Sequence, residues 1–373
     1  MNRRHFLGQT LIGAASLAAT SPALAQAEGE KGIKAAIITN ASGAHLEAYY
    51  TGLAKAPEVA SVVLADPDET AEDNARQLIG PKLVKVYRDR AELFAMERPD
   101  FAVVTMEAVQ APDAIRAALE AGCHVLAEKP ACVRAEDFAP LTELAESSKL
   151  NLCLALANRT NPEMIKARQL MADGVIGKMY GIEVRFVEDQ TRLTNPGYHK
   201  SWFANKARAG GGHLTWLGIH WLDLSMYITG ASITHVAGFS TNIGGQPINI
   251  EDSVAMSMRY DNGALGTMTS GYYRKSGDES LIRIWGSKGW IELSSDDRRR
   301  VRWQDTSTEN APVEEYIGPP DYVHYTAYVG ACVRAAAGLG ASPMTPRECL
   351  RVLKAIYGLY AAADSGKTVE VMG

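Results

Sequence analysis

Short apolar runs that alternate with amphipathic segments fill the first third of the chain. Each run has the length and composition of a buried parallel strand, and the runs lie at residues 34–39, 59–65, 101–105 and 124–127. Residues 44–56, between the first two runs, are compatible with a helix. A second helix is expected from Pro112 to Gly122, because proline favours the first turn of a helix and glycine the position after its end. This order predicts a doubly wound α/β domain at residues 31–155.

The pattern changes after residue 155. Alternating strands are expected on either side of an Asn-Gly turn at residues 261–263, and a second pair on either side of residues 286–289. A final helix is predicted to open at Thr345, which has capping-box spacing to Glu348. Residues 156–373 therefore predict an α+β domain with an open, mainly antiparallel sheet and helices on one face.

The first 27 residues have the features of an export signal. Two adjacent arginines, Arg3 and Arg4, precede an apolar run at residues 11–19 and a small-residue cleavage motif at residues 23–25. The apolar run is too short for a permanent membrane span. We therefore expect a twin-arginine signal peptide at residues 1–27, a periplasmic location and no stable membrane anchor. Because this route exports folded proteins, a cofactor can be inserted before export.

Length and composition narrow the classes of function. The 373 residues suffice for two domains, and the net charge of −5, with 38 basic and 43 acidic residues interspersed, gives no basic face for nucleic acid. The five cysteines lie far apart, without a Cys-x-x-Cys spacing. The sequence therefore signals neither a zinc site nor a disulfide framework, and we expect no metal and no nucleic-acid partner.

A degenerate dinucleotide-binding loop follows the first predicted strand. Residues 39–44 read Thr-Asn-Ala-Ser-Gly-Ala where a G-x-G-x-x-G pattern is typical, so a single glycine is left. Asp66 ends the second strand, where a carboxylate binds the ribose diol of NAD and repels the 2′-phosphate of NADP; the alternative is that Asp66 caps the following helix. The candidate cofactor-binding residues are Asn40, Ala41, Ser42, Gly43 and Asp66, with Thr105 at the end of the fourth strand.

Two motifs carry the candidate catalytic groups. Lys129, in the triplet Glu128-Lys129-Pro130, follows a predicted strand at the edge where open α/β sheets bind ligands, and an ammonium there is suited to stabilise an alkoxide. The alternative is a surface lysine before a rigid turn. His220 is the proposed base, because an ordinary histidine has a pKa of about 6.5; the alternative is a hydrogen-bonded core histidine.

Three glycines at residues 210–212 precede the predicted helix of His220. Their bare backbone permits the close approach of a ligand. The helix is expected to present one face of chemically active side chains at three- and four-residue spacings, namely His213, Trp216, His220, Asp223 and Tyr227. Trp216 and Tyr227 suit either packing or stacking on a pyranose ring, and His213 is a second, weaker candidate for the base.

These segments together resemble the Gfo/Idh/MocA family, which groups glucose-fructose oxidoreductase with inositol and other sugar dehydrogenases. The likeness covers nearly the whole mature chain and rests on residues 121–130, 158–162, 210–223, 251–252 and 365–367. It implies an N-terminal Rossmann domain that binds NAD or NADP, a C-terminal sheet that carries substrate specificity, and a dimer or tetramer. It also implies that Lys129 and His220 are the catalytic pair and that Glu128 and Lys129 lie near the nicotinamide ribose.

Four residues are further candidates for substrate binding, namely Arg159, His213, Trp216 and Asp223. The chain departs from the family pattern at three places. The glycine loop is degenerate, and residues 105–107 read Thr-Met-Glu where a proline usually follows the fourth strand. Trp216 stands where an aspartate usually precedes the histidine by four residues. Without the aspartate, His220 lacks an acidic neighbour that would stabilise its charged form.

We expect from these features an exported oxidoreductase that holds NAD, or NADP, tightly and acts on a ring hydroxyl of a sugar, polyol or glycoside. Because the periplasm lacks a soluble nicotinamide pool, its redox cycle must close within the protein. Two alternatives stay open. One is a nicotinamide-dependent glycoside hydrolase that works by transient oxidation and elimination. The other is a non-catalytic sugar-binding relative, which the replacements at Ala41 and Trp216 motivate.

Overall fold

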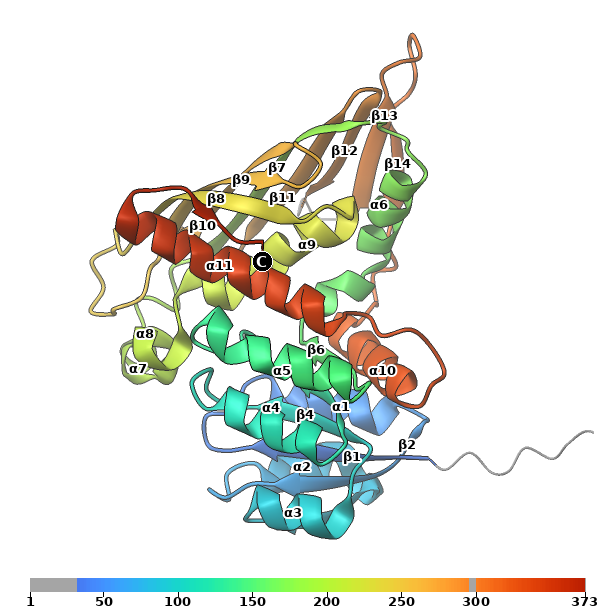
Figure 1. Ribbon diagram of the computed structural model, residues 1–373, viewed down its shortest axis with the longest axis vertical. Helices are drawn as coiled ribbons and strands as arrows, with labels where there is room; N and C mark the ends of the chain where they lie inside the picture. The colour runs from blue at the N-terminus through green and yellow to red at the C-terminus, as the bar shows by residue number, and fades with distance from the viewer. Residues whose placement is uncertain (1–31, 295–299, 373) are drawn as a thin grey trace, which may run out of the picture. The chain divides into compact units, whose positions relative to one another are not determined.

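The computed structural model of the protein describes residues 32–294 and 300–372 (Figure 1). The predicted export signal at residues 1–27 lies outside the described residues. Within the described part of the chain, no helix is both long enough and apolar enough to cross a membrane. Two sheets and the helices that pack on them account for the described fold.

The N-terminal sheet is parallel, with the strand order β3-β2-β1-β4-β5-β6. Its central strands are buried on both faces, which explains their continuous apolar sequences. β1 lies between β2 and β4, so the strands that follow it are added first on one side of β1 and then on the other. At such a change of direction a crevice forms at the carboxyl ends of the strands. The predicted doubly wound fold is confirmed. Its elements are β1 (Ile33–Thr39), α1 (Leu46–Lys55), β2 (Val59–Ala65), α2 (Glu72–Ile79), β3 (Leu83–Tyr87), α3 (Arg90–Glu97), β4 (Phe101–Thr105), α4 (Ala111–Glu120), β5 (His124–Ala127), α5 (Ala135–Ser147) and β6 (Leu152–Leu154).

The C-terminal sheet has the strand order β14-β13-β12-β11-β7-β10-β9-β8-β15. Its pairs are antiparallel except for β7 and β10, which run parallel. The long connection between these two strands supplies the crossover that a parallel pair requires. The sheet is therefore mixed, and mainly antiparallel as expected. Its strands are β7 (Met179–Asp189), β8 (Ile233–Thr241), β9 (Ser253–Tyr260), β10 (Leu265–Arg274), β11 (Glu279–Gly286), β12 (Gly289–Ser294), β13 (Arg300–Asp305), β14 (Glu314–Ile317) and β15 (Val369–Glu370).

Both predicted hairpins of this sheet form. Gly263, in the turn between β9 and β10, has a φ of 85°, a left-handed conformation that glycine adopts without strain. In the hairpin of β11 and β12, Trp285 lies opposite Trp290. The last helix also begins as expected, because Thr345 and Glu348 form a reciprocal capping box.

Helices cover one face of the C-terminal sheet, with α9 and α11 lying against its strands (Figure 1). Residues of β9 alternate between buried and exposed, as they do when one face of a sheet is packed and the other is not. α11 also packs on α5 and α10 packs on α1, so helices join the two sheets. The remaining helices are α6 (Pro162–Ala172), α7 (Pro196–Lys200), α8 (Lys206–Ala209), α9 (Ile219–Thr229), α10 (His324–Ala336) and α11 (Pro346–Ser365).

Candidate active site

A cavity of about 530 Å³ opens at the carboxyl ends of β1, β2 and β4. The loops that follow these strands line it with Asn40, Pro67 and Val109, and Arg88 lines it from beyond β3. This is the crevice at which open α/β sheets bind their ligands. The cavity therefore lies beside the predicted dinucleotide loop.

Hydrogen bonds from neighbouring side chains hold the dinucleotide loop, residues 40–43. The Ala41 N–H donates to Oδ2 of Asp68 at 2.8 Å, and the Ser42 N–H donates to Oδ1 of Asn40 at 3.0 Å. Main-chain N–H groups of this kind are the usual ligands of a dinucleotide pyrophosphate. The carboxylate of Asp68 therefore occupies one of the donors that a pyrophosphate would use.

Close packing of the same loop on β1 and β4 explains the glycine that the sequence keeps. A Cβ atom at Gly43 would collide with the hydroxyl of Thr39. The Thr105 hydroxyl accepts from the Ala44 N–H at 2.9 Å and donates to the Ala44 carbonyl at 2.7 Å. Thr105 thus positions the loop against β4, and it can do so because it is the last residue of this strand.

The carboxylate of Asp66 turns away from the cavity. It is 0% exposed, and its Oδ2 accepts hydrogen bonds from the main-chain N–H groups of Ala71 at 2.8 Å and Glu72 at 3.2 Å. Its neighbours Ala65 and Pro67 line the cavity. The contacts of Asp66 are those of the helix-capping alternative, and they differ from the ribose contact expected from the sequence, because the start of α2 lies within reach of the side chain.

Glu128 lies buried directly after β5 and binds two side chains, that of His45 before α1 and that of Tyr49 within α1. Its Oε2 accepts a hydrogen bond from the Tyr49 hydroxyl at 2.5 Å and lies 2.9 Å from Nδ1 of His45. Burial raises the pKa of Glu128, but His45, Lys129 and the hydrogen bonds outweigh it and bring the pKa below its ordinary value. The carboxylate is therefore ionised and fixes the His45 ring.

The ammonium group of Lys129 has Trp216 as its main partner. Nζ donates to the Trp216 carbonyl at 2.5 Å and lies 3.3 Å from the centre of the indole ring, on which the His45 ring stacks at 5.7 Å. Lys129 is 1% exposed, and this burial lowers its pKa to about 7, against the opposing effect of Glu128. The peptide bond from Lys129 to Pro130 is cis. Lys129 is thus a lysine that changes charge near neutral pH.

His220 lies in the first turn of α9, near Lys129. Burial lowers its pKa well below the ordinary value, and the charge of Lys129 lowers it further. Its ring is therefore neutral at neutral pH. Within residues 32–294 and 300–372 its Nδ1 has no hydrogen-bond partner. The structure thus brings together the two predicted catalytic groups, one from each sheet region, while the low pKa makes His220 a weaker base than the sequence suggested.

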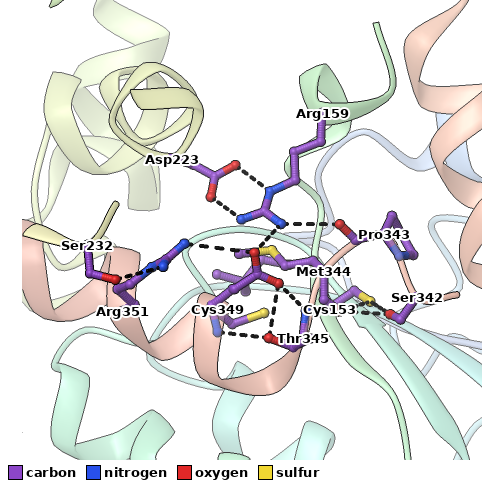
Figure 2. A network of polar contacts seen from close by, with 12 residues as sticks. Cys153, Arg159, Asp223, Ser232, Ser342, Pro343, Met344, Thr345, Cys349 and Arg351 are labelled. Atoms are coloured by element: carbon purple, nitrogen blue, oxygen red, sulfur yellow. Dashed lines mark hydrogen bonds and ion pairs between the residues drawn. The ribbon is translucent and has the colours of Figure 1, made fainter. Parts of the chain in front are cut away.

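Arg159 and Asp223 pair with each other in the interior (Figure 2). Nε and Nη2 of Arg159 donate to the two carboxylate oxygens of Asp223 at 2.8 and 2.7 Å, and Nη1 donates to Glu348 at 3.0 Å and to the Pro343 carbonyl at 3.2 Å. Arg159 is 2% exposed and Asp223 1%. Their polar groups bind each other and join α9 to the start of α11, while the expected contact with a substrate stays a prediction.

His213 lies in the core and contacts side chains of the protein itself, and its expected role as a substrate ligand stays a prediction. Its Nδ1 lies 2.7 Å from the Ser270 hydroxyl, and its ring contacts Phe186 and Tyr272 at 5.6 and 4.5 Å between centres. Burial, and to a lesser degree Arg192, lowers its pKa to about 3. A fully buried, neutral ring of this kind packs the segment before α9 against β7 and β10.

The triple glycine approaches the protein's own backbone. A Cβ atom at Gly212 would collide with the Glu251 carbonyl, and one at Gly211 would collide with the Tyr360 hydroxyl. The Glu251 carboxylate also accepts from the Gly212 N–H at 2.6 Å and the Leu214 N–H at 2.9 Å. In place of the expected ligand approach, the glycines permit close contact between the segment before the π-helical turn at Leu214–Gly218 and Glu251, which precedes β9.

A π-helical turn at Leu214–Gly218 precedes α9. Such a turn closes i→i+5 hydrogen bonds and shifts the angular position of the residues after it. His213 therefore faces the sheet, Trp216 faces Lys129, and Asp223 faces Arg159. This local geometry explains why the expected single face of active side chains does not form.

His45 and Tyr49 contribute to the site although the sequence interpretation passed over them. Both bind Glu128, and His45 also stacks on Trp216. A usable signal exists, because the two residues are four apart at the start of the helix after the dinucleotide loop, and this spacing puts them on one face.

No group of three His, Cys, Asp or Glu residues in the described ranges is arranged to hold a metal ion.

Solved structures with this fold extend over nearly the whole described chain. An oxidoreductase domain protein from Kribbella flavida has a TM-score of 0.81, covers 92% of this chain and 100% of its own, and is 22% identical. Levoglucosan dehydrogenase in complex with NADH has a TM-score of 0.80, with 91% and 99% coverage and 17% identity. At such low identity the likeness concerns the fold.

Three curated relatives are sugar-related dehydrogenases by name. D-apiose dehydrogenase from Paraburkholderia graminis is 24% identical over 324 residues, which are 83% of this chain and 82% of the relative. D-glucoside 3-dehydrogenase from Escherichia coli is 28% identical over 181 residues, and levoglucosan dehydrogenase from Pseudarthrobacter phenanthrenivorans is 26% identical over 197 residues. These last two matches cover 45% and 46% of this chain and 50% of each relative.

Two models of one family match consecutive parts of the chain. Residues 33–155 match the model described as an oxidoreductase family with an NAD-binding Rossmann fold, and residues 164–292 match the GFO/IDH/MocA C-terminal domain. The two matches follow the division between the two sheets and together exceed half of the chain. The chain therefore belongs to the Gfo/Idh/MocA family of oxidoreductases.

Proposed function

We propose that the protein is an NAD-dependent oxidoreductase that acts on a ring hydroxyl of a sugar, polyol or glycoside. One observation carries the proposal: Lys129, at the carboxyl edge of the N-terminal sheet, meets the helical segment of Trp216 and His220. The family's NAD-binding domain supports the redox chemistry. The relatives named as apiose, glucoside and levoglucosan dehydrogenases support the substrate class.

The residues at the sheet edge fit a nicotinamide dinucleotide. The cavity of about 530 Å³ has the size of a small-molecule site, and Gly43 provides the close turn before α1 that a pyrophosphate-binding loop needs. Asn40, Ser42 and Gly43 would hold the pyrophosphate, and Glu128 and Lys129 the nicotinamide ribose. When bound, nicotinamide supplies the acceptor for a hydride from the carbinol carbon.

Lys129 is better suited than His220 to take the hydroxyl proton. Its pKa of about 7 lies at neutral pH, where a proton acceptor is most effective, whereas the pKa of His220 lies well below its ordinary value. The neutral His220 ring is suited to orient the hydroxyl through a hydrogen bond. For this contact the substrate hydroxyl replaces the Trp216 carbonyl at Nζ, and the indole ring moves away from the amine.

The rate of sugar oxidation is expected to rise with pH through about 7 and then to level off. Burial lowers the pKa of Lys129 to about 7, so the neutral amine that accepts the proton predominates above this pH. The substitution Lys129→Arg is expected to abolish the rise, because arginine keeps its charge throughout this range. The measurement is kcat/KM against pH for both proteins. A profile that is flat in the wild type would exclude Lys129 as the titrating base.

The substitution Asp68→Ala is expected to tighten NADH binding roughly threefold to tenfold, the usual effect of one hydrogen bond. Asp68 accepts from the Ala41 N–H, and its removal frees this donor and removes a negative charge from the loop. Fluorescence titration with NADH measures the change. Asp305→Ala is the matched control, since Asp305 accepts from the Ser307 N–H at 2.9 Å on the distant β13. Equal or weaker binding in Asp68→Ala contradicts the prediction.

Product analysis tests the proposed function. The purified protein is incubated with NAD and a panel of free sugars, polyols and glycosides, and NADH and carbohydrate products are identified by mass spectrometry. A keto sugar formed with NADH supports the proposal. Release of an aglycone without net change in NADH supports the glycoside-cleaving alternative, and binding without any product supports the non-catalytic one.

We further propose that residues 1–27 direct export by the twin-arginine route and that the mature protein retains its cofactor in the periplasm as a homo-oligomer. The adjacent arginines and the apolar run support the export proposal. Native mass spectrometry of the periplasmic fraction reports location, cofactor content and subunit number in one measurement. A protein found only in the cytoplasm contradicts the export proposal.

A further inference from the structure

Residues 196–209, here called the strap, connect β7 to the triple glycine and lie on the two loops beside the cavity. The indole Nε1 of Trp202 donates to the Ser42 carbonyl at 3.2 Å. The Val109 N–H donates to the Arg208 carbonyl at 3.1 Å. The strap belongs to the C-terminal part of the chain, yet it is bonded to the loop after β1 and to the loop after β4.

A buried carboxylate fixes the end of the strap. Glu107 follows β4 and is 4% exposed, and Nε of Arg208 donates to its Oε2 at 2.7 Å while Nη2 donates to its Oε1. Glu107 also accepts from the Ser42 hydroxyl at 2.9 Å. Arg208 lowers the pKa of Glu107, burial opposes this effect, and the Ser42 hydroxyl lowers the pKa further. The pKa therefore lies below its ordinary value, and the carboxylate is charged. A two-bond arginine–carboxylate pair is both strong and specific in geometry.

Apolar contacts continue from this ion pair toward Lys129. Trp202 and Ala209 pack with Ala108, which follows Glu107 in the chain. The ring of Phe203 meets the ring of Trp216 edge to face at 4.4 Å, and Trp216 is the partner of the Lys129 ammonium. The strap therefore extends from the dinucleotide loop to the candidate catalytic lysine.

We infer that the Arg208–Glu107 ion pair is a latch that holds the strap closed and slows the release of the bound dinucleotide. The inference rests on the proposed function, because it assigns residues to the retention of that cofactor. A dinucleotide at the crevice lies against the loops after β1 and β4, and the strap is bonded to both. The strap acts on release through these two loops, which border the cavity. When the loops move apart to release the dinucleotide, the strap loses its bonds to them and the ion pair breaks. Glu107 and Arg208 act on the cofactor through the strap and are positioning residues.

The test is the rate of NADH release, followed by stopped-flow fluorescence after mixing with excess NAD. The variant Arg208→Gln is expected to release NADH about 10-fold faster than the wild type, the effect of losing one charged hydrogen-bonded pair. Arg208→Lys keeps the charge but loses the second bond, and an intermediate rate is expected. Arg334→Gln is the matched control: Arg334 pairs with Glu58 at 2.7 Å, also between distant parts of the chain, but away from the strap.

Hydrogen exchange gives a second readout that needs no cofactor. The Val109 amide is bonded to the strap, so its exchange is expected to speed up in Arg208→Gln and to stay unchanged in Arg334→Gln. Faster release with unchanged Val109 protection overturns the latch, since Arg208 then acts by touching the cofactor. Unchanged release overturns it as well and leaves the proposed function standing. Faster release and exchange with no sugar oxidised supports the latch and refutes the proposed function, and a wild type that binds no NADH refutes both.

Discussion

Sugar oxidation is expected to fall by about 10²- to 10⁴-fold when Lys129 is replaced by methionine, the usual contribution of a positioned proton-transfer group. Methionine keeps the length and packs on the Trp216 ring, but it has no proton to exchange and no charge near neutral pH. NADH binding is expected to weaken by a much smaller factor than turnover, because Lys129 would contribute one contact to the nicotinamide ribose, whereas other residues line the cavity and form the dinucleotide loop. The measurements are the single-turnover rate constant of sugar oxidation and a titration with NADH.

A second lysine provides the control for this substitution. Nζ of Lys166 lies 5.1 Å from the centre of the Trp303 ring, a contact of the same type outside the candidate site. Lys166→Met is expected to leave turnover at the level of the wild type. If Lys129→Met keeps a wild-type rate, the proton chemistry assigned to this amine is wrong, whatever the protein oxidises.

Local sequence features located Lys129 because its place depends on short-range rules. It follows an apolar run with the length of a buried strand, and such runs end at the ligand-binding edge of a parallel sheet. The glycine turn between β9 and β10 and the capping box of Thr345 are local in the same sense, and both were confirmed. The fold was thus predictable wherever neighbouring residues set the backbone.

Side-chain directions after residue 212 were less accessible to sequence reasoning. Equal three- and four-residue spacings predict a shared face only in a regular α-helix, and the π-helical turn at Leu214–Gly218 breaks this regularity. His213 therefore faces Ser270, whereas Trp216 faces Lys129. Ion pairs between residues far apart in the chain cannot be predicted from local patterns either. Glu107 pairs with Arg208, which lies 101 positions later.

The ambiguous predictions were those in which one residue satisfied two physical rules. Asp66 stands both at the end of a strand, where it can bind ribose, and five residues before the N–H of Ala71, where it can cap a helix. The hydrogen bonds of the structure belong to the second rule. Only the three-dimensional distance to α2 decides between them, because both readings use the same sequence position.

The substitution Asp223→Ala is expected to lower the free energy of unfolding by about 3–5 kcal/mol, the usual effect of removing one partner of a buried ion pair. Arg159 is 2% exposed and loses two hydrogen bonds in this variant, which leaves its charge in the interior with Glu348 as the remaining carboxylate partner (Figure 2). Urea-induced unfolding of the mature protein measures the change. Glu146→Ala is the control: Glu146 pairs with the exposed Arg347 at 2.7 Å, and an exposed pair contributes about 0–1 kcal/mol.

The double variant Arg159→Met/Asp223→Leu separates a pairing effect from a packing effect. When both charges are replaced by apolar side chains of similar size, no unpaired charge is left in the interior, and most of the lost stability is expected to return. A double variant as unstable as Asp223→Ala would show that the shape of the two side chains, rather than their charges, holds α9 to the start of α11. A stable Asp223→Ala variant would instead mean that Glu348 alone neutralises Arg159, and the substrate-binding hypothesis for Asp223 would again have to be tested.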